Sequence, residues 1–184
     1  VVTVHDLGSE YLPSMHQLKQ RIYLSLMQKY QLQTATKIIA VSNHTKVDLI
    51  KRVGVDSKKI QVIYEGFDKN LFKPAKGSPY KNYFLFVGTV QPRKNLARLI
   101  QAFAKFRDMY QVSSIKGKNK KPLIHNTNPL SLVIAGSKGW MSDGIYALPK
   151  ILGIEDRVKF LGYVPEKDLP ALYSAAIALT FPSL

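Results

Sequence analysis

Residues 83–106 read YFLFVGTVQPRKNLARLIQAFAKF, and this stretch predicts a strand, a basic turn and a helix in immediate succession. Tyr83–Val87 is an apolar run ended by Gly88, a pattern typical of a parallel strand that is covered on both faces. Apolar side chains then recur at helical spacing, and the side chain of Asn95 is placed to cap the helix. The apolar positions of this helix are Leu96, Leu99, Ile100, Phe103 and Phe106. A strand followed directly by an amphipathic helix indicates an α/β fold.

The turn between this strand and helix carries two cations, Arg93 and Lys94, directly after Pro92. It follows the carboxyl end of a strand, where open α/β sheets bind ligands, and it begins a helix, whose backbone amides favour anions. Two cations at the N-terminus of a helix interact unfavourably with the helix dipole unless an anion is bound, which supports a phosphate site. The alternative is that Arg93 and Lys94 are simply solvated side chains at the start of the helix. The turn has neither the glycine fingerprint of dinucleotide-binding folds nor the Lys-Ser/Thr of a P-loop.

The rest of the chain also alternates between expected strands and helices, so we predict parallel sheets with right-handed crossovers. Further strands are expected at residues 1–4, 37–41, 60–63, 131–135, 158–164 and 177–181. Further helices are expected at residues 14–33, at 43–53 between a Ser42 cap and a Gly54 stop, and near 165–173. In the last helix, the side chains expected to point inward are Leu169, Leu172 and Tyr173.

The composition favours an anionic partner without choosing among such partners. The 184 residues include 27 Lys and Arg against 12 Asp and Glu, a net charge of +15. A nucleotide diphosphate, a lipid phosphate, a membrane surface or a nucleic acid would suit this charge. Residues 108–130, which carry several lysines, are interpreted as a solvated loop, with attraction to an anionic membrane or RNA as the alternative. No aromatic residue interleaves the lysines at 116–121, so a stacking surface for single-stranded nucleic acid is missing there.

Several kinds of chemistry are excluded or weakly supported. The chain has no cysteine, which excludes disulfides and thiolate chemistry and fits a reducing cytosol. No acidic pair stands in a constellation typical of hydrolysis, and no apolar run approaches the length of a membrane span. Metal binding has little support, because the histidines lack the spacing of metal ligands. The four histidines are His5, His16, His44 and His125.

Seven motifs, in order along the chain, carry a resemblance to a known family. They are TVHDL, IIAVSNHTK, VGTVQPRKNLARLIQAF, LVIAG, VKFLGYV, LYSAA and FPSL. Together they closely resemble glycosyltransferase family 4, whose members are retaining enzymes of the GT-B fold. The resemblance implies two Rossmann-like domains with parallel sheets, and a nucleotide-sugar donor as substrate. It also implies that no cofactor is needed and that the transfer is independent of metal.

The resemblance further implies a domain organisation. Residues 1–63 would form the C-terminal part of the N-terminal, acceptor-side domain, residues 64–82 the interdomain linker, and residues 83–184 the first part of the C-terminal, donor-binding domain. The chain begins without Met and stops at FPSL, whereas family members continue into a glycine-rich loop and a Glu-x7-Glu motif. We therefore expect a fragment in which both domains are incomplete, and which by itself is inactive or at best a weak nucleotide binder.

The implied donor site lies in the second of these domains. Lys94 matches the family's diphosphate lysine, with Arg93 beside it, and the backbone amides at Gly88 and Thr89 would support it. Many relatives have Arg where this chain has Thr89, so one expected cation is absent. These groups would stabilise the charge that develops on the leaving diphosphate. The backbone that would face the nucleotide base comprises Gly162, Tyr163 and Val164.

His5, in the loop after the first expected strand, is the catalytic candidate. Taken alone, a loop histidine is more simply explained by a hydrogen bond to Asp6 or to nearby backbone. The resemblance instead matches His5 to the histidine that family members place beside the transferred sugar, near the acceptor. Relatives usually have Asn where this chain has Glu65, so no role is assigned to Glu65.

The function implied by the resemblance is sugar transfer with retention of configuration, in cell-surface polysaccharide synthesis, with a leaning towards mannose. The expected partners are a nucleoside-diphosphate sugar and a saccharide or lipid-linked acceptor; a peripheral contact with an anionic membrane stays open, and nucleic acid is disfavoured. The expected location is the cytoplasm, with the inner face of the membrane as a further option. Two alternatives remain: a GT-B-fold nucleotide-sugar epimerase, which would lack an acceptor site, and a non-catalytic basic module that binds membrane or nucleic acid.

Overall fold

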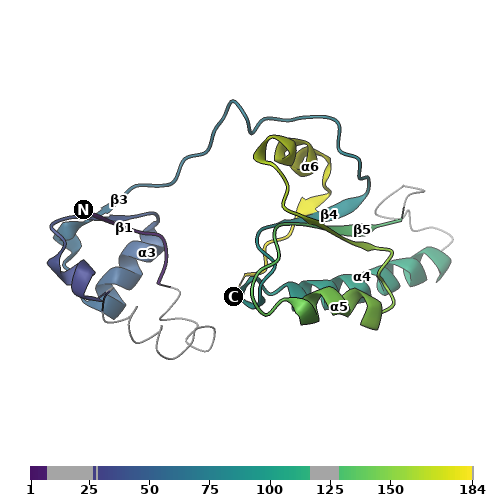
Figure 1. Cartoon of the computed structure of the whole chain (residues 1–184), viewed down its shortest axis with the longest axis horizontal. Coiled ribbons are helices and arrows are strands. Elements are labelled where there is room, and N and C mark those ends of the chain that lie inside the picture. The colour runs from purple at the N-terminus through teal and green to yellow at the C-terminus, as the bar shows by residue number, and fades with distance from the viewer. Residues whose placement is uncertain (8–26, 28, 117–128, 184) are drawn as a thin grey trace. The chain divides into compact units, whose positions relative to one another are not determined.

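The computed structural model describes residues 1–7, 27, 29–116 and 129–183. The chain divides into two compact units, Val1–Phe67 and Asp68–Leu184, called here the first and the second unit (Figure 1). Within the described residues, every helix is too short or too polar to span a lipid bilayer.

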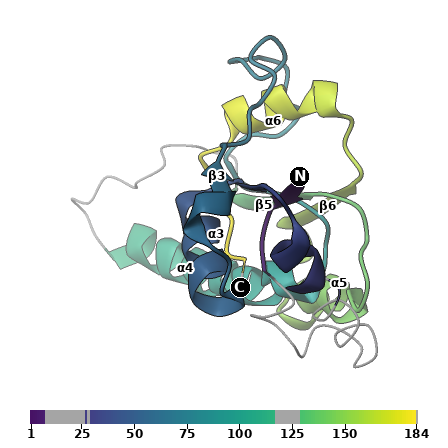
Figure 2. The ribbon, with the colours of Figure 1, turned by 90° about the vertical axis from the view of Figure 1, so that its left-hand side faces the viewer.

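The first unit contains a three-stranded parallel sheet in the order β1-β2-β3. The strands are β1 (Val2–Val4), β2 (Ile38–Ala40) and β3 (Ile60–Val62), and Ile39 pairs with Thr3 on one side and Gln61 on the other. Between β2 and β3, the chain forms α3 (Asn43–Asp48) and a π-helical turn (Leu49–Val53). Figure 2 shows α3 beside β3, which it contacts. The buried core residues of this unit are Val4, Leu7, Leu32, Ala35, Ile38, Ala40, Leu49, Val55 and Ile60.

The predicted ends of the helix at residues 43–53 are confirmed. The backbone amide of Thr45 donates a hydrogen bond to Ser42 Oγ over 3.0 Å, which makes Ser42 the N-cap. Gly54 follows the π-helical turn with a φ of +75°, a left-handed conformation that ends the helix. Of the helix predicted at residues 14–33, only 27 and 29–33 are described, and these are helical; the remainder lies outside the described residues.

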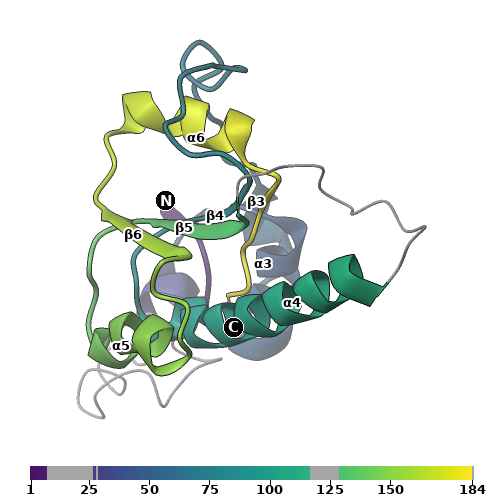
Figure 3. The same ribbon diagram turned by 90° about the vertical axis from the view of Figure 1, so that its right-hand side faces the viewer.

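The second unit contains a four-stranded parallel sheet in the order β6-β5-β4-β7. Its strands are β4 (Tyr83–Val87), β5 (Ser131–Ala135), β6 (Val158–Gly162) and β7 (Ala178–Leu179). Its helices are α4 (Leu96–Lys116), α5 (Asp143–Ile151) and α6 (Leu169–Ala175). Figure 3 shows α4 and α5 on one face of the sheet and α6 on the other. This arrangement is a doubly wound α/β layer structure, as the alternation of strands and helices predicts.

The apolar run of β4 is continuous because both of its faces are covered. Phe84 and Phe86 pack into the core formed with α4 and α5, whereas Tyr83 and Leu85 pack into the core formed with α6. Successive strand residues point to opposite faces, so each core takes every second side chain. The buried core on the α4 and α5 face comprises Phe86, Val90, Leu96, Ile100, Phe103, Ala104, Leu130, Leu132, Ile134, Ile145, Ile154 and Val158.

Three expectations about the helices of this unit are wrong. Helix α4 continues to Lys116, through the start of the segment interpreted as a loop, because no Gly or Pro interrupts residues 96–116. Asn95 has a φ of +58° and a ψ of +26°, a left-handed geometry unlike the extended backbone of an N-cap. Tyr173 is 37% exposed and meets the ring of Phe72 edge to face, instead of pointing into the core.

The hydroxyl of Tyr83 joins β4 to α6 inside the second unit. The side chain is fully buried, and its hydroxyl donates a hydrogen bond to the Leu172 carbonyl over 2.7 Å and lies 3.1 Å from Ser78 Oγ. Tyr83→Phe is expected to lower the free energy of unfolding by about 1–2 kcal/mol, because a buried carbonyl loses its donor. Urea unfolding at neutral pH measures this loss. Tyr163→Phe, at a position that is 76% exposed, is the matched control and should have almost no effect.

The same pair of variants tests a pH dependence. Burial raises the pKa of Tyr83 above its ordinary value. As pH rises, the unfolded chain therefore loses this proton before the folded chain does. The contribution of the Tyr83 hydroxyl to the free energy of unfolding is complete below about pH 10, and it is lost as pH rises through the raised pKa of the folded state. As pH rises above about 10, the wild type should lose stability more steeply than Tyr83→Phe. Equal slopes would contradict the burial of this hydroxyl.

Candidate functional site

Three loops meet at the carboxyl edge of the sheet in the second unit. They follow β4, β5 and β6, and we call residues 88–91, 136–139 and 162–164 the carboxyl-edge loops. Val90 N donates to the Ser137 carbonyl over 2.9 Å, and Gly139 N donates back to the Val90 carbonyl over 2.9 Å. Gly136 N donates to the Gly162 carbonyl over 2.7 Å. Backbone hydrogen bonds thus hold the three loops together at the edge where open α/β sheets bind ligands.

Glycine allows these loops to approach one another closely. Gly136 has a φ of +157°, and a Cβ atom placed on it would lie 1.9 Å from the Gly88 carbonyl oxygen. A Cβ on Gly139 would lie 2.7 Å from the Val90 carbonyl oxygen. Both approaches are shorter than any normal contact, so the backbone of one loop occupies the space that a side chain on the other would need. The Gly88 amide donates to the Ala135 carbonyl over 2.9 Å and therefore continues the sheet hydrogen bonding.

The basic turn forms a short 3₁₀-helix, Pro92–Lys94, directly before α4. Arg93 is exposed, whereas Lys94 is half-buried. The ammonium of Lys94 lies 4.7 Å from the ring centroid of Phe181, which follows β7. That ring stacks on Phe86 of β4, with centroids 6.4 Å apart and planes 13° apart. The cation–π contact therefore places the Lys94 ammonium over a ring that stacks on β4.

The structure places a further cation, Lys138, on the same loops, and the sequence motifs predict no role for it. Lys138 pairs with Val90 in a parallel bridge, and its Nζ lies 2.6 Å from Asp143 Oδ1 and 5.9 Å from the ring centroid of Tyr146. The hydrogen bond to Asp143 raises the pKa of Lys138. Lys138 stands in the loop after β5, as Arg93 and Lys94 stand in the turn after β4, so the same sequence signal was sufficient to find it.

The residues expected to face the nucleotide base lie at the end of β6. Gly162 has a φ of +70°, and its carbonyl receives the Gly136 amide, so this residue belongs to the carboxyl-edge loops. Tyr163 is 76% exposed. The side chain of Val164 packs against the core on the α6 side. The structure thus brings Gly162 together with Gly136 and leaves the ring of Tyr163 accessible to a ligand.

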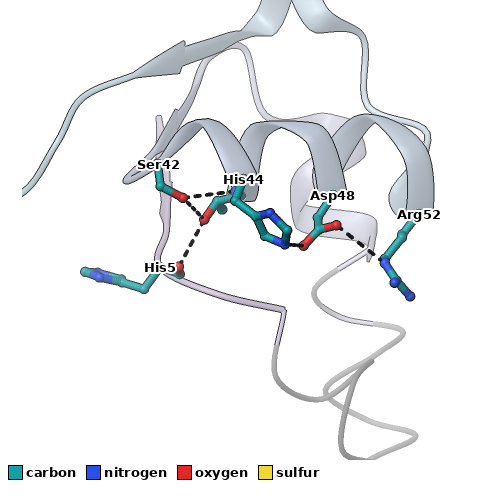
Figure 4. Close-up of polar contacts among 6 residues, drawn as sticks. His5, Ser42, His44, Asp48 and Arg52 are labelled. Atoms are coloured by element: carbon teal, nitrogen blue, oxygen red, sulfur yellow. Dashed lines mark hydrogen bonds and ion pairs between the residues drawn. The ribbon is translucent and has the colours of Figure 1, made fainter. Parts of the chain in front are cut away.

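In the first unit, His5 follows β1, and its imidazole contacts the carboxylate of Glu65, which comes shortly after β3. His5 Nδ1 lies 2.8 Å from Glu65 Oε1, and the two side chains are 67% and 63% exposed. Figure 4 shows the imidazole directed away from α3, whereas the His5 carbonyl accepts a hydrogen bond from Thr45 Oγ1 over 3.3 Å. The partner of this imidazole is therefore Glu65, for which the resemblance implies no role.

A second set of charges lies along α3 and the turn after it (Figure 4). Asp48 Oδ2 lies 3.5 Å from His44 Nε2, and Asp48 Oδ1 lies 3.5 Å from Arg52 Nε. Each partner stands four residues from Asp48, which is the spacing of stabilising pairs on one helix face. These pairs are explained by helix stability alone. Among the described residues, no group of three His, Cys, Asp or Glu side chains is arranged to hold a metal ion.

The fold matches that of several solved structures. HepE of Anabaena, solved in complex with UDP and glucose, superposes with a TM-score of 0.68 at 21% sequence identity. The alignment covers 99% of this chain and 46% of HepE. The predicted fold class, α/β with parallel sheets of the GT-B type, is confirmed.

Sequence comparison shows the family. The model described as "Glycosyl transferases group 1" matches residues 68–184, and that described as "Glycosyltransferase Family 4" matches residues 1–71. O-antigen chain mannosyltransferase B of Escherichia coli is 28% identical, and O-antigen chain mannosyltransferase RfbU of Salmonella typhimurium is 31% identical. Each alignment covers 100% of this chain, which spans 46% and 45% of the two relatives. The chain belongs to the glycosyl transferases group 1 family.

Proposed function

We propose that the protein encoded by the complete gene transfers a sugar from a nucleoside-diphosphate sugar to a saccharide or lipid-linked acceptor, with retention of anomeric configuration. The observation that carries this proposal is the position of Lys94. Its ammonium lies 4.7 Å from the ring centroid of Phe181, and its turn directly follows the first of the three carboxyl-edge loops. Two further findings support the proposed sugar transfer: the chain belongs to the glycosyl transferases group 1 family, and its fold is similar to that of HepE, which was solved in complex with UDP and glucose.

The chemistry requires stabilisation of the leaving diphosphate. Negative charge grows on this group as the glycosidic bond breaks, and fixed cations and amides can stabilise it without a metal ion. We assign this role to Lys94 and Arg93, with the backbone at Gly88 and Thr89 shaping the loop. The backbone around Gly162, Tyr163 and Val164 is the proposed contact of the base. His5 is the proposed catalytic group on the acceptor side.

The substrates and setting are proposed from the relatives. Both bacterial relatives named above are O-antigen chain mannosyltransferases. We therefore propose that the donor carries a hexose, with mannose as the first candidate, and that the protein acts in cell-surface polysaccharide synthesis. The net charge of +15 suits an anionic donor and also an anionic membrane surface. We propose the cytoplasm as its location, with peripheral contact at the inner face of the membrane as a further option.

The test is an assay of the protein encoded by the complete gene against a panel of nucleoside-diphosphate sugars that includes mannose. We expect transfer to a saccharide or lipid-linked acceptor, a product with the anomeric configuration of the donor by NMR, and no loss of rate with a chelator. A nucleotide sugar that is epimerised without any acceptor would replace this proposal with an epimerase. Tight binding to anionic vesicles or RNA that nucleoside diphosphates do not displace would replace it with a binding module.

A further inference from the structure

The contact between His5 and Glu65 joins two loops at the carboxyl edge of the first sheet. His5 follows β1, the Glu65 carboxylate follows β3, and both ends of the contact are tied to the start of α3. The His5 carbonyl accepts from Thr45 Oγ1 over 3.3 Å, and Asn43 Nδ2 donates to the hydroxyl of Tyr64, the residue before Glu65, over 2.9 Å. These anchors hold the two backbones so that Oε1 lies 2.8 Å from Nδ1.

The chemistry of the contact decides where the imidazole carries its proton. An ionised carboxylate only accepts hydrogen bonds, so at this distance Nδ1 must be the protonated nitrogen that donates to Glu65. The remaining nitrogen, Nε2, then carries the lone pair of the neutral ring. A carboxylate that accepts from one imidazole nitrogen thus fixes both the tautomer and the orientation of the other nitrogen.

We propose that Glu65 is a positioning residue for His5. It accepts the hydrogen bond from Nδ1 and presents Nε2 to the bound substrate, where the ring can accept or share a proton. This inference rests on the proposed catalytic role of His5. Stability does not explain the contact, since both side chains are more than half exposed and such pairs add little to the folded state.

The first experiment records the protonation of the His5 ring without any assay of activity. Long-range ¹H–¹⁵N NMR on the 184-residue chain, at a pH where imidazoles are neutral, reports which nitrogen carries the proton, and His5→Ala identifies the signals of this ring. We expect the Nδ1–H tautomer in the wild type. Glu65→Ala should shift the ring towards the Nε2–H form that free histidine favours in water. Glu65→Gln keeps a carbonyl oxygen acceptor and should preserve the Nδ1–H form.

The second experiment uses the protein encoded by the complete gene. Glu65→Ala is expected to lower kcat by about 10–100-fold with little change in the KM of the donor, and Glu65→Gln to recover most of that loss. The melting temperature should stay within about 2 °C of the wild type. Glu155→Ala removes an exposed carboxylate from the second unit and should leave both kcat and stability unchanged.

The outcomes separate this inference from the proposed function. If the ring of His5 shows the same tautomers in the wild type and in Glu65→Ala, the positioning role is overturned. It is also overturned if His5→Ala slows turnover and Glu65→Ala does not. If His5→Ala leaves turnover intact, the catalytic role of His5 is wrong, and the inference about Glu65 is lost with it.

Discussion

Alanine at position 136 is expected to destabilise the second unit by about 3 kcal/mol and to remove nucleotide binding along with it. A Cβ on Gly136 would lie 1.9 Å from the Gly88 carbonyl oxygen and 2.5 Å from its carbon. The Gly88 backbone cannot easily yield, because its amide is bonded to Ala135 and the Val90 amide to Ser137. The φ of +157° adds strain for any residue with a side chain. Relief of this clash would separate the loops that form the candidate site.

The matched control is Gly144→Ala, in α5 of the same unit. A Cβ on Gly144 meets no atom within 4 Å, and alanine favours a helix, so this variant should gain about 0.5–1 kcal/mol. Urea unfolding followed by fluorescence measures both changes in the second unit, because Trp140 is the one tryptophan of the sequence. Wild-type stability and nucleotide binding in Gly136→Ala would show that the loops after β4 and β5 do not meet in this way.

The sequence predicts those parts of the fold that depend on local pattern. The strands at Tyr83–Val87 and Ser131–Ala135 were found because both faces are covered, which makes the apolar run continuous. Ser42 and Gly54 were found because helix ends depend on the chemistry of single residues. The end of α4 was misplaced because charged and polar residues suit an exposed helix as well as a loop.

The parts of the candidate site that depend on contacts between distant residues could not be predicted. His5 and Glu65 are separated by sixty positions, and only the parallel sheet brings their loops to one edge. The ring of Phe181 beneath Lys94 is likewise placed by the pairing of β7 with β4. A sequence motif identifies residues of a type that can bind phosphate. Which distant side chains contact and orient those residues is determined by the tertiary fold.

Lys94→Ala is expected to weaken binding of a nucleoside diphosphate by about 10–100-fold, because a charge-assisted contact with the diphosphate is lost. Phe181→Leu keeps an apolar side chain but removes the ring 4.7 Å from the ammonium, and it should weaken binding by about 2–5-fold. Isothermal titration calorimetry of the 184-residue chain measures both effects, at low and at moderate salt, since the loss of one cation should also reduce the salt dependence of binding.

The control for net charge is Lys105→Ala, an exposed lysine further along α4. It removes the same charge as Lys94→Ala but leaves the carboxyl edge of the sheet intact. If Lys94 binds the diphosphate directly, Lys105→Ala should change the affinity for the nucleoside diphosphate by less than about 2-fold, because a distant charge is screened by salt. Equal losses in the two variants would mean that the overall charge of +15 attracts the nucleotide and that Lys94 does not contact it. A loss confined to Lys94→Ala, with a smaller one in Phe181→Leu, would assign the diphosphate to the basic turn after β4.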